Sequence, residues 1–504
     1  MKITYQYRFY PSTKQKLELN HWLRISRYWY NRQLGERFDW WKNNHLQLKS
    51  FPFWKNIFPS LFGNKPNYYS QKLQLPIIKQ DLVKVFHSGE LLDFKRVEST
   101  ILQDVCKRVD KAFERFIIGD VNGKRSGKPR FQSESSFKTM TFATANDNWI
   151  KLVRKNWFYL QLPKLGIVKV RIHRSLGSQD LKKWGQPSNE IVLEDQGSTK
   201  QGCPHFFAAI SKPTGFKIKQ ISVTKKVDGW YMQVCLEDNS VPQHTPDPII
   251  PTWDNSMGLD AVLHGNDYLA TSDGEKLPSL KVLRKSQHKL DKISLIRNKR
   301  KRGSKSRRKL AKKEGKQHQK IARSRKDFHY KTAHKLIRSG KKVFFHEKLN
   351  LQGLGKRNKP KQDETGKFLP NGQSAKSGLN KSWNDAAFPQ FFEIFSYIAE
   401  KAGAVVVPQN PAYTSQLLSY RNEIVFTSLN ARKYWDEKEL IYVDRDINAA
   451  INLKKLGLGI FPRIKRRSGK IVIEGSIADS TMKEILNIFH KTSEAYTEFV
   501  LKSV

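Results

Sequence analysis

Three acidic residues stand within or at the ends of apolar segments in the second half of this 504-residue chain. Asp260 lies inside the apolar run of residues 257–263, and Glu347 closes the apolar run of residues 343–347. Short apolar runs of this length indicate buried strands. Asp446 stands at the entrance of a predicted helix that continues through the alanines at 449 and 450. The pattern predicts an α/β domain in which two strands and one helix end carry carboxylates.

Such a triplet suits phosphodiester hydrolysis. That reaction uses two Mg²⁺ ions roughly 4 Å apart, which clamp the attacking and leaving oxygens. Mg²⁺ takes oxygen ligands, and the mutual repulsion of clustered carboxylates favours its uptake. A lone Asp near a strand end is more often a turn or cap residue, so the prediction depends on the triplet. We expect Asp260, Glu347 and Asp446 to be catalytic and to bind Mg²⁺ or Mn²⁺.

The charge of the chain points to a polyanionic partner. Lys and Arg number 92 against 46 Asp and Glu, a formal net charge of +46. Nucleic acid is the expected partner because phosphate neutralisation releases counterions; a merely basic protein is the weaker alternative. Of the seventeen residues from 297 to 313, eleven are Lys or Arg and none is acidic. That run is either a solvated helix face or, as we favour, a phosphate-binding one.

The predicted phosphate contacts come from this run and from a basic turn at residues 127–131. They are Arg297, Arg300, Arg302, Lys305, Arg307, Arg308, Lys309, Lys128 and Arg130. Aromatic residues 28–30, with 40 and 41, could stack on bases, although packing in a core is the favoured interpretation.

Membrane and disulfide chemistry are not expected. The sequence has no apolar run of roughly 18 residues and no signal-peptide pattern after Met1, which favours a cytoplasmic, nucleoid-associated protein without a membrane partner. Cys106, Cys203 and Cys235 are widely spaced, which excludes a disulfide framework and a cysteine-rich zinc site.

The length suggests two to four domains, and we expect a multidomain α+β fold. Residues 1–10 and 136–245 are assigned to a β-barrel-like domain, and residues 11–135 to a helical domain inserted into it. A linker at 246–255 leads to an α/β nuclease domain at 256–456, followed by a C-terminal extension at 457–504. A capping box at Ser12 and Gln15 starts the first helix, and Asp228-Gly229 marks a hairpin.

Finer expectations concern connections and helices. Residues 175–215 are predicted to be a polar surface insertion, and residues 280–339 a long basic helical region. Residues 355–381 are predicted to be a polar loop, and residues 385–402 a helix.

Several longer sequence motifs make the chain resemble a known family. They are Gly258-Leu259-Asp260, Ala270-Thr271-Ser272-Asp273-Gly274, Phe345-His346-Glu347-Lys348-Leu349-Asn350, Asn410-Pro411-Ala412-Tyr413-Thr414-Ser415-Gln416 and Asp444-Arg445-Asp446-Ile447-Asn448-Ala449-Ala450-Ile451-Asn452. Together with Tyr7-Arg8-Phe9-Tyr10-Pro11 and Lys128-Pro129-Arg130-Phe131, they make the chain resemble the TnpB (OrfB) proteins of insertion sequences and the related type V CRISPR nucleases over roughly residues 1–456.

The resemblance implies an RNase H-like (RuvC) nuclease domain, preceded by a β-barrel-like wedge domain with an inserted helical recognition domain. It implies that the second aspartate of the last motif, Asp446, is catalytic. It also implies a guide RNA that pairs with double-stranded target DNA while the protein reads a short flanking motif. Thr100 and Gln103 are the candidates for that contact.

The sequence departs from the family at its zinc ribbon. The four expected cysteine positions, in a degenerate ribbon at residues 413–443, hold Leu418, Arg421, Asp436 and Glu439. Thiolate zinc is therefore excluded, and a salt bridge from Arg421 to one of the acids is a possible substitute. The common glycine two positions after Asp260 is Val262, which is expected to alter the strand edge.

The expected function is RNA-guided DNA endonuclease. The alternatives are a nuclease-silent RNA-guided DNA-binding protein or repressor, favoured by the lost ribbon, and a transposon-encoded transposase accessory protein. The sequence leaves open the origin of the guide, the flanking motif and the oligomeric state.

Overall fold

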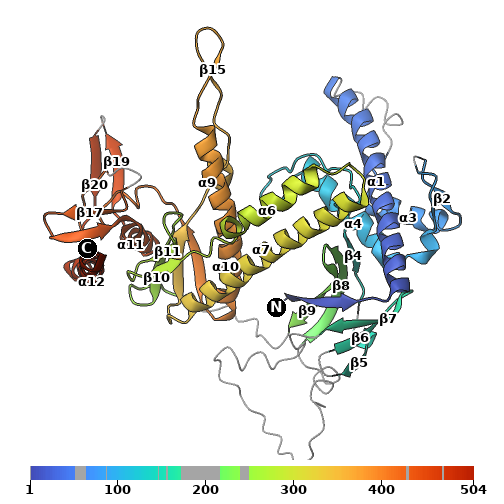
Figure 1. Ribbon diagram of the computed structural model, residues 1–504, viewed down its shortest axis with the longest axis horizontal. Helices are drawn as coiled ribbons and strands as arrows, with labels where there is room; N and C mark the ends of the chain where they lie inside the picture. The colour runs from blue at the N-terminus through green and yellow to red at the C-terminus, as the bar shows by residue number, and fades with distance from the viewer. Residues whose placement is uncertain are drawn as a thin grey trace, which may run out of the picture. The chain divides into compact units, whose positions relative to one another are not determined.

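The computed structural model describes residues 2–50, 64–86, 88–145, 147–154, 157–171, 216–238, 249–426, 431–467 and 470–503. The chain divides into two compact units, Met1–His244 and Thr245–Val504 (Figure 1). Each unit is described by itself below. The polar insertion expected at residues 175–215 lies outside the described residues.

The first unit combines one large sheet with helices. Its elements are β1 Lys2–Tyr10, α1 Thr13–Ser50, α3 Tyr68–Ile78, β2 Val83–Lys84, β3 Leu91–Leu92, η2 Phe94–Arg96, α4 Ser99–Ile117, β4 Thr139–Phe142, η3 Asp147–Trp149, β5 Ile150–Arg154, β6 Trp157–Leu162, β7 Gly166–Arg171, β8 Phe216–Lys226 and β9 Gly229–Asp238.

The large sheet is antiparallel, with strand order β4-β8-β9-β1-β7-β6-β5. The N-terminal strand β1 therefore lies in the middle, and its alternate residues Tyr7 and Phe9 are buried. The hairpin predicted at Asp228-Gly229 is confirmed, because β8 and β9 pair from Lys226↔Gly229 onward. Among the described residues β4 and β5 are the sheet's two edges, so hydrogen bonds do not close it into a barrel.

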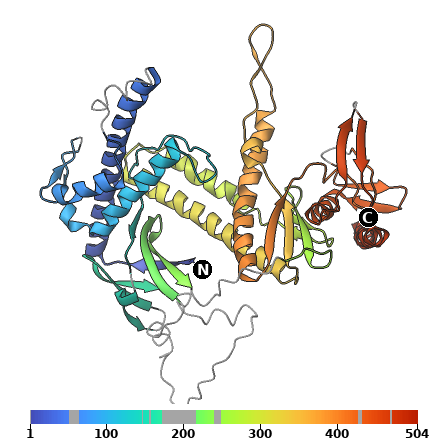
Figure 2. The same ribbon diagram turned by 180° about the vertical axis from the view of Figure 1, so that it is seen from behind.

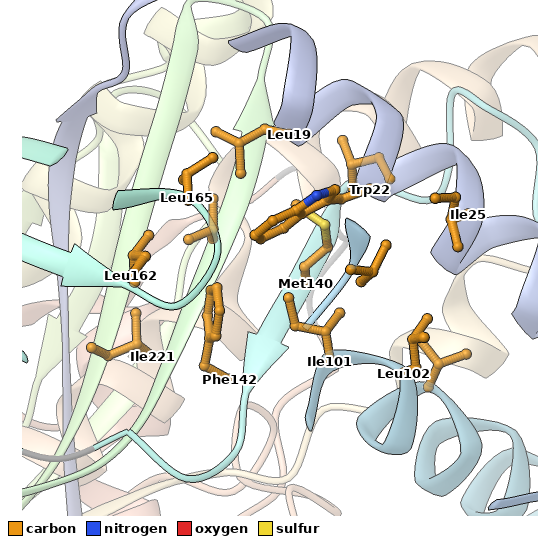
Figure 3. Close-up of a cluster of buried hydrophobic side chains, with 14 of the residues drawn as sticks. Leu19, Trp22, Ile25, Ile101, Leu102, Met140, Phe142, Leu162, Leu165 and Ile221 are labelled. Atoms are coloured by element: carbon orange, nitrogen blue, oxygen red, sulfur yellow. The ribbon is translucent and has the colours of Figure 1, made fainter. Parts of the chain in front are cut away.

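Helix α1 begins with the predicted capping box. Ser12 N donates to Gln15 Oε1 at 2.9 Å, and Gln15 N donates to Ser12 Oγ at 3.2 Å. Trp22 and Trp29 of α1 are fully buried. Figure 3 shows Trp22 among side chains from α4 and β4, including Met140. Helices and sheet share one hydrophobic core, which confirms core packing for Trp29 because it removes that ring from solvent.

The second unit is an α/β unit. Its elements are β10 Ser256–Ala261, β11 Asp267–Thr271, β12 Lys276–Pro278, α6 Val282–Asn298, α7 Lys305–Ile337, β13 Val343–Glu347, α8 Leu351–Leu354, β14 Lys361–Gln362, β15 Phe368–Leu369, α9 Gln373–Ala386, α10 Phe388–Lys401, β16 Val405–Gln409, β17 Lys433–Asp436, β18 Ile441–Asp444, α11 Arg445–Gly457, β19 Arg463–Arg467, β20 Lys470–Glu474 and α12 Asp479–Ser503.

The main sheet of this unit is mixed, with order β12-β11-β10-β13-β16. Strands β12, β11 and β10 are antiparallel neighbours, whereas β10, β13 and β16 run parallel. Parallel strands need a crossover connection, and α6 with α7, then α9 with α10, provide the two crossovers. Phe344 of β13 and Phe395 of α10 are buried together, with ring centroids 4.9 Å apart.

The basic helical region expected at 280–339 is confirmed, and it consists of two helices, α6 and α7, separated by a turn in which Gly303 takes a left-handed φ of 82°. The helix expected at 385–402 is confirmed as α10, although it begins at Phe388, after Ala387 with its φ of 49°. One expectation about the connections was wrong. Residues 355–381 are not a loop but include the β14–β15 hairpin and the first half of α9. Polarity misled here because Asp385 is the one buried residue of α9, so few of its residues needed to be apolar.

The end of the chain packs as part of the second unit. Helix α12 lies beside the β17–β18 hairpin and α11 (Figures 1 and 2). Its Ile485 and Phe489 are fully buried in a cluster with Val443 and Ile451. The expected extension at 457–504 therefore contributes to the core around α11. No helix among the described residues is both long and apolar enough to cross a membrane.

Candidate functional site

Asp260 and Glu347 occupy matching positions on neighbouring parallel strands. The last registered pair between β10 and β13 is Leu259↔His346, and each acid is the next residue along its strand. Side chains at matching positions of neighbouring strands point to the same face of a sheet. The strand register therefore brings these two carboxyl groups together.

Helix α11 brings the third acid to the same place. A Cβ on Gly258 of β10 would lie 1.9 Å from the carbonyl oxygen of Ala450, so only glycine lets α11 lie against this strand. The first turn of α11 carries Asp446. The close packing of α11 on β10 therefore explains why the Gly258-Leu259-Asp260 motif begins with glycine.

The three acids interact electrostatically. Burial, followed by repulsion from Glu347 and Asp446, raises the pKa of Asp260 well above its ordinary value. Burial raises the pKa of Glu347 to about 7. A shift of this kind in clustered acids marks a functional-site candidate.

Asp446 is held between two cations. Its Oδ2 lies 3.0 Å from Nζ of Lys276, and its Oδ1 lies 3.0 Å from Nη1 of Arg432. Lys276 comes from β12, and Arg432 directly precedes β17. These two ion pairs balance part of the negative charge that the carboxylates accumulate.

The neighbouring Asp444 has a structural role. It is the N-cap of α11, where its Oδ1 accepts hydrogen bonds from the backbone N–H groups of Asp446 at 3.0 Å and Ile447 at 3.3 Å. Its other oxygen lies 2.7 Å from Nζ of Lys276. An N-cap oxygen satisfies helix donors that would otherwise lack partners, so Asp444 is engaged in holding the helix start.

The donor chemistry of the three acids fits Mg²⁺, which takes oxygen ligands. As arranged here, however, the described residues contain no group of three or more His, Cys, Asp or Glu side chains that could hold a metal ion. Lys276 and Arg432 occupy the oxygens of Asp446 instead. Metal uptake at this site would require these ion pairs to rearrange.

Three of the four positions where the cysteines of a zinc ribbon were expected form a polar cluster. Nη1 of Arg421 lies 2.8 Å from Oδ2 of Asp436 and 3.9 Å from Oε1 of Glu439. Tyr420 also donates its O–H to Asp436. The fourth position, Leu418, is fully buried. The salt bridge expected from Arg421 is confirmed.

Val262 does not disturb the strand it follows. Its N–H donates to the Tyr268 carbonyl at 3.0 Å, which continues the β10–β11 pairing. Its side chain is buried in the cluster around α11. The expected change at the strand edge stays a prediction, and the valine methyl groups fill the core there.

Two of the predicted phosphate contacts in the basic run have structural partners. Arg297 of α6 forms an ion pair with Glu314 of α7. Nη1 of Arg307 donates to the carbonyls of Arg297 at 3.1 Å and Arg300 at 2.9 Å, at the end of α6. The other five are exposed: Arg300, Arg302, Lys305, Arg308 and Lys309.

The candidates in the first unit lie apart from this run in sequence. Lys128 is exposed, and its Nζ lies 4.4 Å from the ring centroid of Phe38. Arg130 is exposed as well. Thr100 and Gln103 are half-buried at the start of α4, one helical turn apart. These placements leave their predicted contacts untested.

Three family models match the chain. Residues 250–358 match the family described as "Probable transposase", and residues 388–453 match the "Cas12f1-like, TNB domain". Residues 1–45 match the "Helix-turn-helix domain" of OrfB proteins. Among curated proteins, a TnpB-like protein of Acanthamoeba polyphaga mimivirus, L79, is 27% identical over 300 residues. The chain is therefore similar to TnpB-like proteins over these segments.

Other similarities are more distant. A Streptomyces pristinaespiralis protein, named as a candidate RNA-guided DNA endonuclease, is 22% identical over 91% of the chain and 90% of its own length. The alignment with L79 covers 57% of this chain and 54% of the relative, so the chain spans about half the length of that relative. A cryo-EM structure of a Cas12f1–sgRNA–target DNA complex is 14% identical, with 91% and 100% coverage of the two chains and a TM-score of 0.28.

The N-terminal match differs from its description. In this chain, residues 2–50 form one strand and one continuous helix, α1, rather than two helices joined by a turn. Because Trp22 and Trp29 anchor α1 in the core, this helix cannot enter a groove of DNA on that face.

Sequence reasoning missed Lys276 and Arg432. Neither stands in a motif that the sequence singled out, and lone basic residues are common in a chain of this charge. Lys276 lies two residues after the Ala270–Gly274 motif, and Arg432 lies in the segment where a zinc ribbon was expected. Only the tertiary structure places both against Asp446.

Proposed function

We propose that this chain is an RNA-guided DNA endonuclease whose nuclease domain, residues 256–456, is RNase H-like. The observation that carries the proposal is the meeting of Asp260, Glu347 and Asp446 from β10, β13 and α11, with mutual repulsion that raises the pKa of Asp260. The strand order β12-β11-β10-β13-β16 supports it, because three antiparallel strands followed by two parallel ones suit an RNase H-like sheet.

The three acids would hold Mg²⁺ or Mn²⁺, which activates a nucleophilic water and stabilises the leaving oxygen of a phosphodiester. Gly258 and the N-cap Asp444 keep α11 in place, so that Asp446 faces the two strands. Lys276 and Arg432 flank Asp446 and offer positive charge to a DNA phosphate. The exposed cations of α7 would grip the phosphate backbone without reading sequence.

Guide RNA and double-stranded DNA are the proposed partners. The Streptomyces relative is named as a candidate RNA-guided DNA endonuclease, and the net charge of +46 suits two nucleic acids at once. The protein would read a short flanking motif through the first unit, with Thr100 and Gln103 as the proposed contacts. No zinc is required, because Arg421 and Asp436 occupy ribbon positions.

The test is cleavage of target DNA by protein purified with its RNA. Asp260→Ala, Glu347→Ala and Asp446→Ala should each abolish cleavage, and EDTA should abolish it in the unmodified protein. Binding, measured by gel shift, should change less than threefold. Asp444→Asn is the matched control: it keeps an N-cap acceptor and should retain cleavage. Full cleavage by Asp446→Ala would refute the site.

The second candidate is a nuclease-silent RNA-guided DNA-binding protein. It is favoured by the absence, among the described residues, of three acids arranged to hold a metal. Isothermal titration of Mg²⁺ into the protein separates the two candidates. The endonuclease requires binding that disappears in Asp260→Ala, whereas the silent protein requires no binding and no cleavage at any Mg²⁺ or Mn²⁺ concentration.

A further inference from the structure

A pocket of about 420 Å³ lies within the second unit beside the candidate site. Its lining includes Lys276 of β12, Lys433 of β17, Tyr442 of β18, and Tyr496 of α12. This volume falls in the range of roughly 300–1,000 Å³ that is typical of small-molecule sites. Asp444, the N-cap of α11, also contributes to the lining, so the pocket and the acids share one wall.

Helix α12 builds one side of the pocket. Gly274 takes a left-handed φ of 87°, and a Cβ there would lie 3.0 Å from Ile488 of α12, so glycine permits the close approach. The N–H of Tyr442 donates to Oγ of Ser493 at 3.1 Å, which fixes α12 against β18. The family-model matches end at residue 453, whereas α12 begins at Asp479. The pocket therefore depends on a part of the chain outside those matches.

The pocket combines two ammonium groups with two aromatic rings. The rings of Tyr442 and Tyr496 lie 5.2 Å apart at an interplanar angle of 69°. Nζ of Lys433 lies 3.6 Å from the ring centroid of Tyr496. Burial lowers the pKa of Lys433, partly offset by attraction from Asp444, so this cation would gain from a phosphate neighbour.

The negative charge in the lining is already compensated. Asp444 lies 2.7 Å from Nζ of Lys276 and accepts two backbone N–H groups of α11. Lys276 also contacts Asp446 and, at 3.7 Å, Asp267. It therefore links the pocket to the candidate catalytic acid. Aromatic rings that stack on bases, next to cations that contact phosphates, are what single-stranded nucleic acid binding uses.

We propose that this pocket holds one nucleotide of a single-stranded nucleic acid, with its base against Tyr496 and Tyr442 and its phosphate on Lys433. The inference rests on the proposed function, because Lys276 then places the next phosphate beside Asp446. The C-terminal helix α12 thereby becomes part of the substrate path. It positions one nucleotide next to the three acids, in addition to packing against the β17–β18 hairpin.

The test is photo-cross-linking of the full-length protein with its co-purified RNA, in EDTA, to a single-stranded DNA oligonucleotide containing 5-iodouracil. Peptide mapping by mass spectrometry should find the cross-link on Tyr496 or Tyr442. Lys433→Gln should reduce that cross-link on the order of tenfold, given the typical cost of removing a stacking or phosphate-binding side chain. Tyr496→Phe keeps the ring and should retain cross-linking, whereas Tyr496→Ala should lose it.

Lys491→Gln is the matched control, because Lys491 lies exposed on the same helix but does not line the pocket; it should leave the cross-link unchanged. The inference is overturned if the cross-links lie only elsewhere, or if Lys433→Gln leaves the yield at Tyr442 and Tyr496 unaltered while the protein remains folded. Cleavage plays no part in this measurement. A protein that cross-links here but never cuts DNA would refute the nuclease proposal and keep this one.

Discussion

At the scale of single residues, Glu347 carries the clearest pH dependence. Burial raises its pKa to about 7 from an ordinary value of 4.5. Below pH 4.5 the carboxyl is protonated in both folded and unfolded protein and has no effect on stability. Between pH 4.5 and 7 only the unfolded chain releases the proton, so the free energy of unfolding falls as pH rises. Above pH 7 the loss is complete.

Glu347→Gln should therefore stabilise the metal-free protein more at pH 8 than at pH 5.5, by about 2 kcal/mol. The measurement is thermal or urea unfolding in EDTA at both values of pH. Glu393→Gln is the control, because Glu393 is exposed on α10. Excess Mg²⁺ should reduce the difference in unfolding free energy between Glu347→Gln and the unmodified protein at pH 8, because the metal offsets the carboxylate charge. A stability difference that does not change with pH would contradict the buried, repelled state of Glu347.

At the scale of elements, the segment where a zinc ribbon was expected is held by ion pairs. Burial would raise the pKa of Asp436, but hydrogen bonds from Tyr420 and Arg421 outweigh it and hold this pKa below its usual range. Arg421→Ala leaves a buried carboxylate without its main cation. It should cost about 2–3 kcal/mol of unfolding free energy.

The control for that variant is Lys438→Ala. Lys438 forms an exposed pair with Glu423 at 3.0 Å, so its loss should cost under about 1 kcal/mol. Elemental analysis of the purified protein should find no zinc. Stoichiometric zinc, or equal stability of the two variants, would rule out this role for Arg421.

The exposed basic residues of helix α7 lead to a prediction about DNA binding. Arg308, Lys309 and Lys312 are exposed on its first turns. Changing all three to Ala should weaken DNA binding equally for all sequences. It should also reduce the log–log salt slope by roughly one unit for each phosphate that the variant no longer neutralises. The measurement is a binding titration at several salt concentrations.

Arg307 provides the contrast on the same helix. Because it donates to carbonyls at the end of α6, Arg307→Ala should lower thermal stability and leave the salt slope nearly unchanged. A sequence-specific loss of affinity in the triple variant would contradict a backbone-binding role for α7.

At the scale of the whole molecule, target choice needs information that the described fold does not visibly supply. Helix α1 is fixed in the core of its unit, and the basic helices can grip phosphates without distinguishing bases. The protein purified from cells should therefore carry a defined RNA. Removing that RNA with ribonuclease should abolish sequence-specific cleavage, and adding it back should restore it. Specific cleavage by RNA-free protein would refute guidance by RNA.

Local sequence determined the elements whose evidence lies within a few residues. Short apolar runs predicted β10 and β13, and the capping box predicted the start of α1. The apolar context of Asp260, Glu347 and Asp446 predicted the three acids as a group. Each of these patterns follows from the geometry of a single strand or helix turn.

Tertiary structure decided whatever depends on residues far apart in the chain. Lys276 and Arg432 are 156 positions apart, as 432 minus 276, yet both contact Asp446. Polar α9 was missed because a helix that buries one residue shows little apolar periodicity. Ile485 and Phe489 of helix α12 pack in the core around α11. The sequence of residues 457–504 did not predict this contact. The pattern of apolar side chains predicts which face of an element is buried. Only packing in the tertiary structure determines which distant part of the chain covers that face.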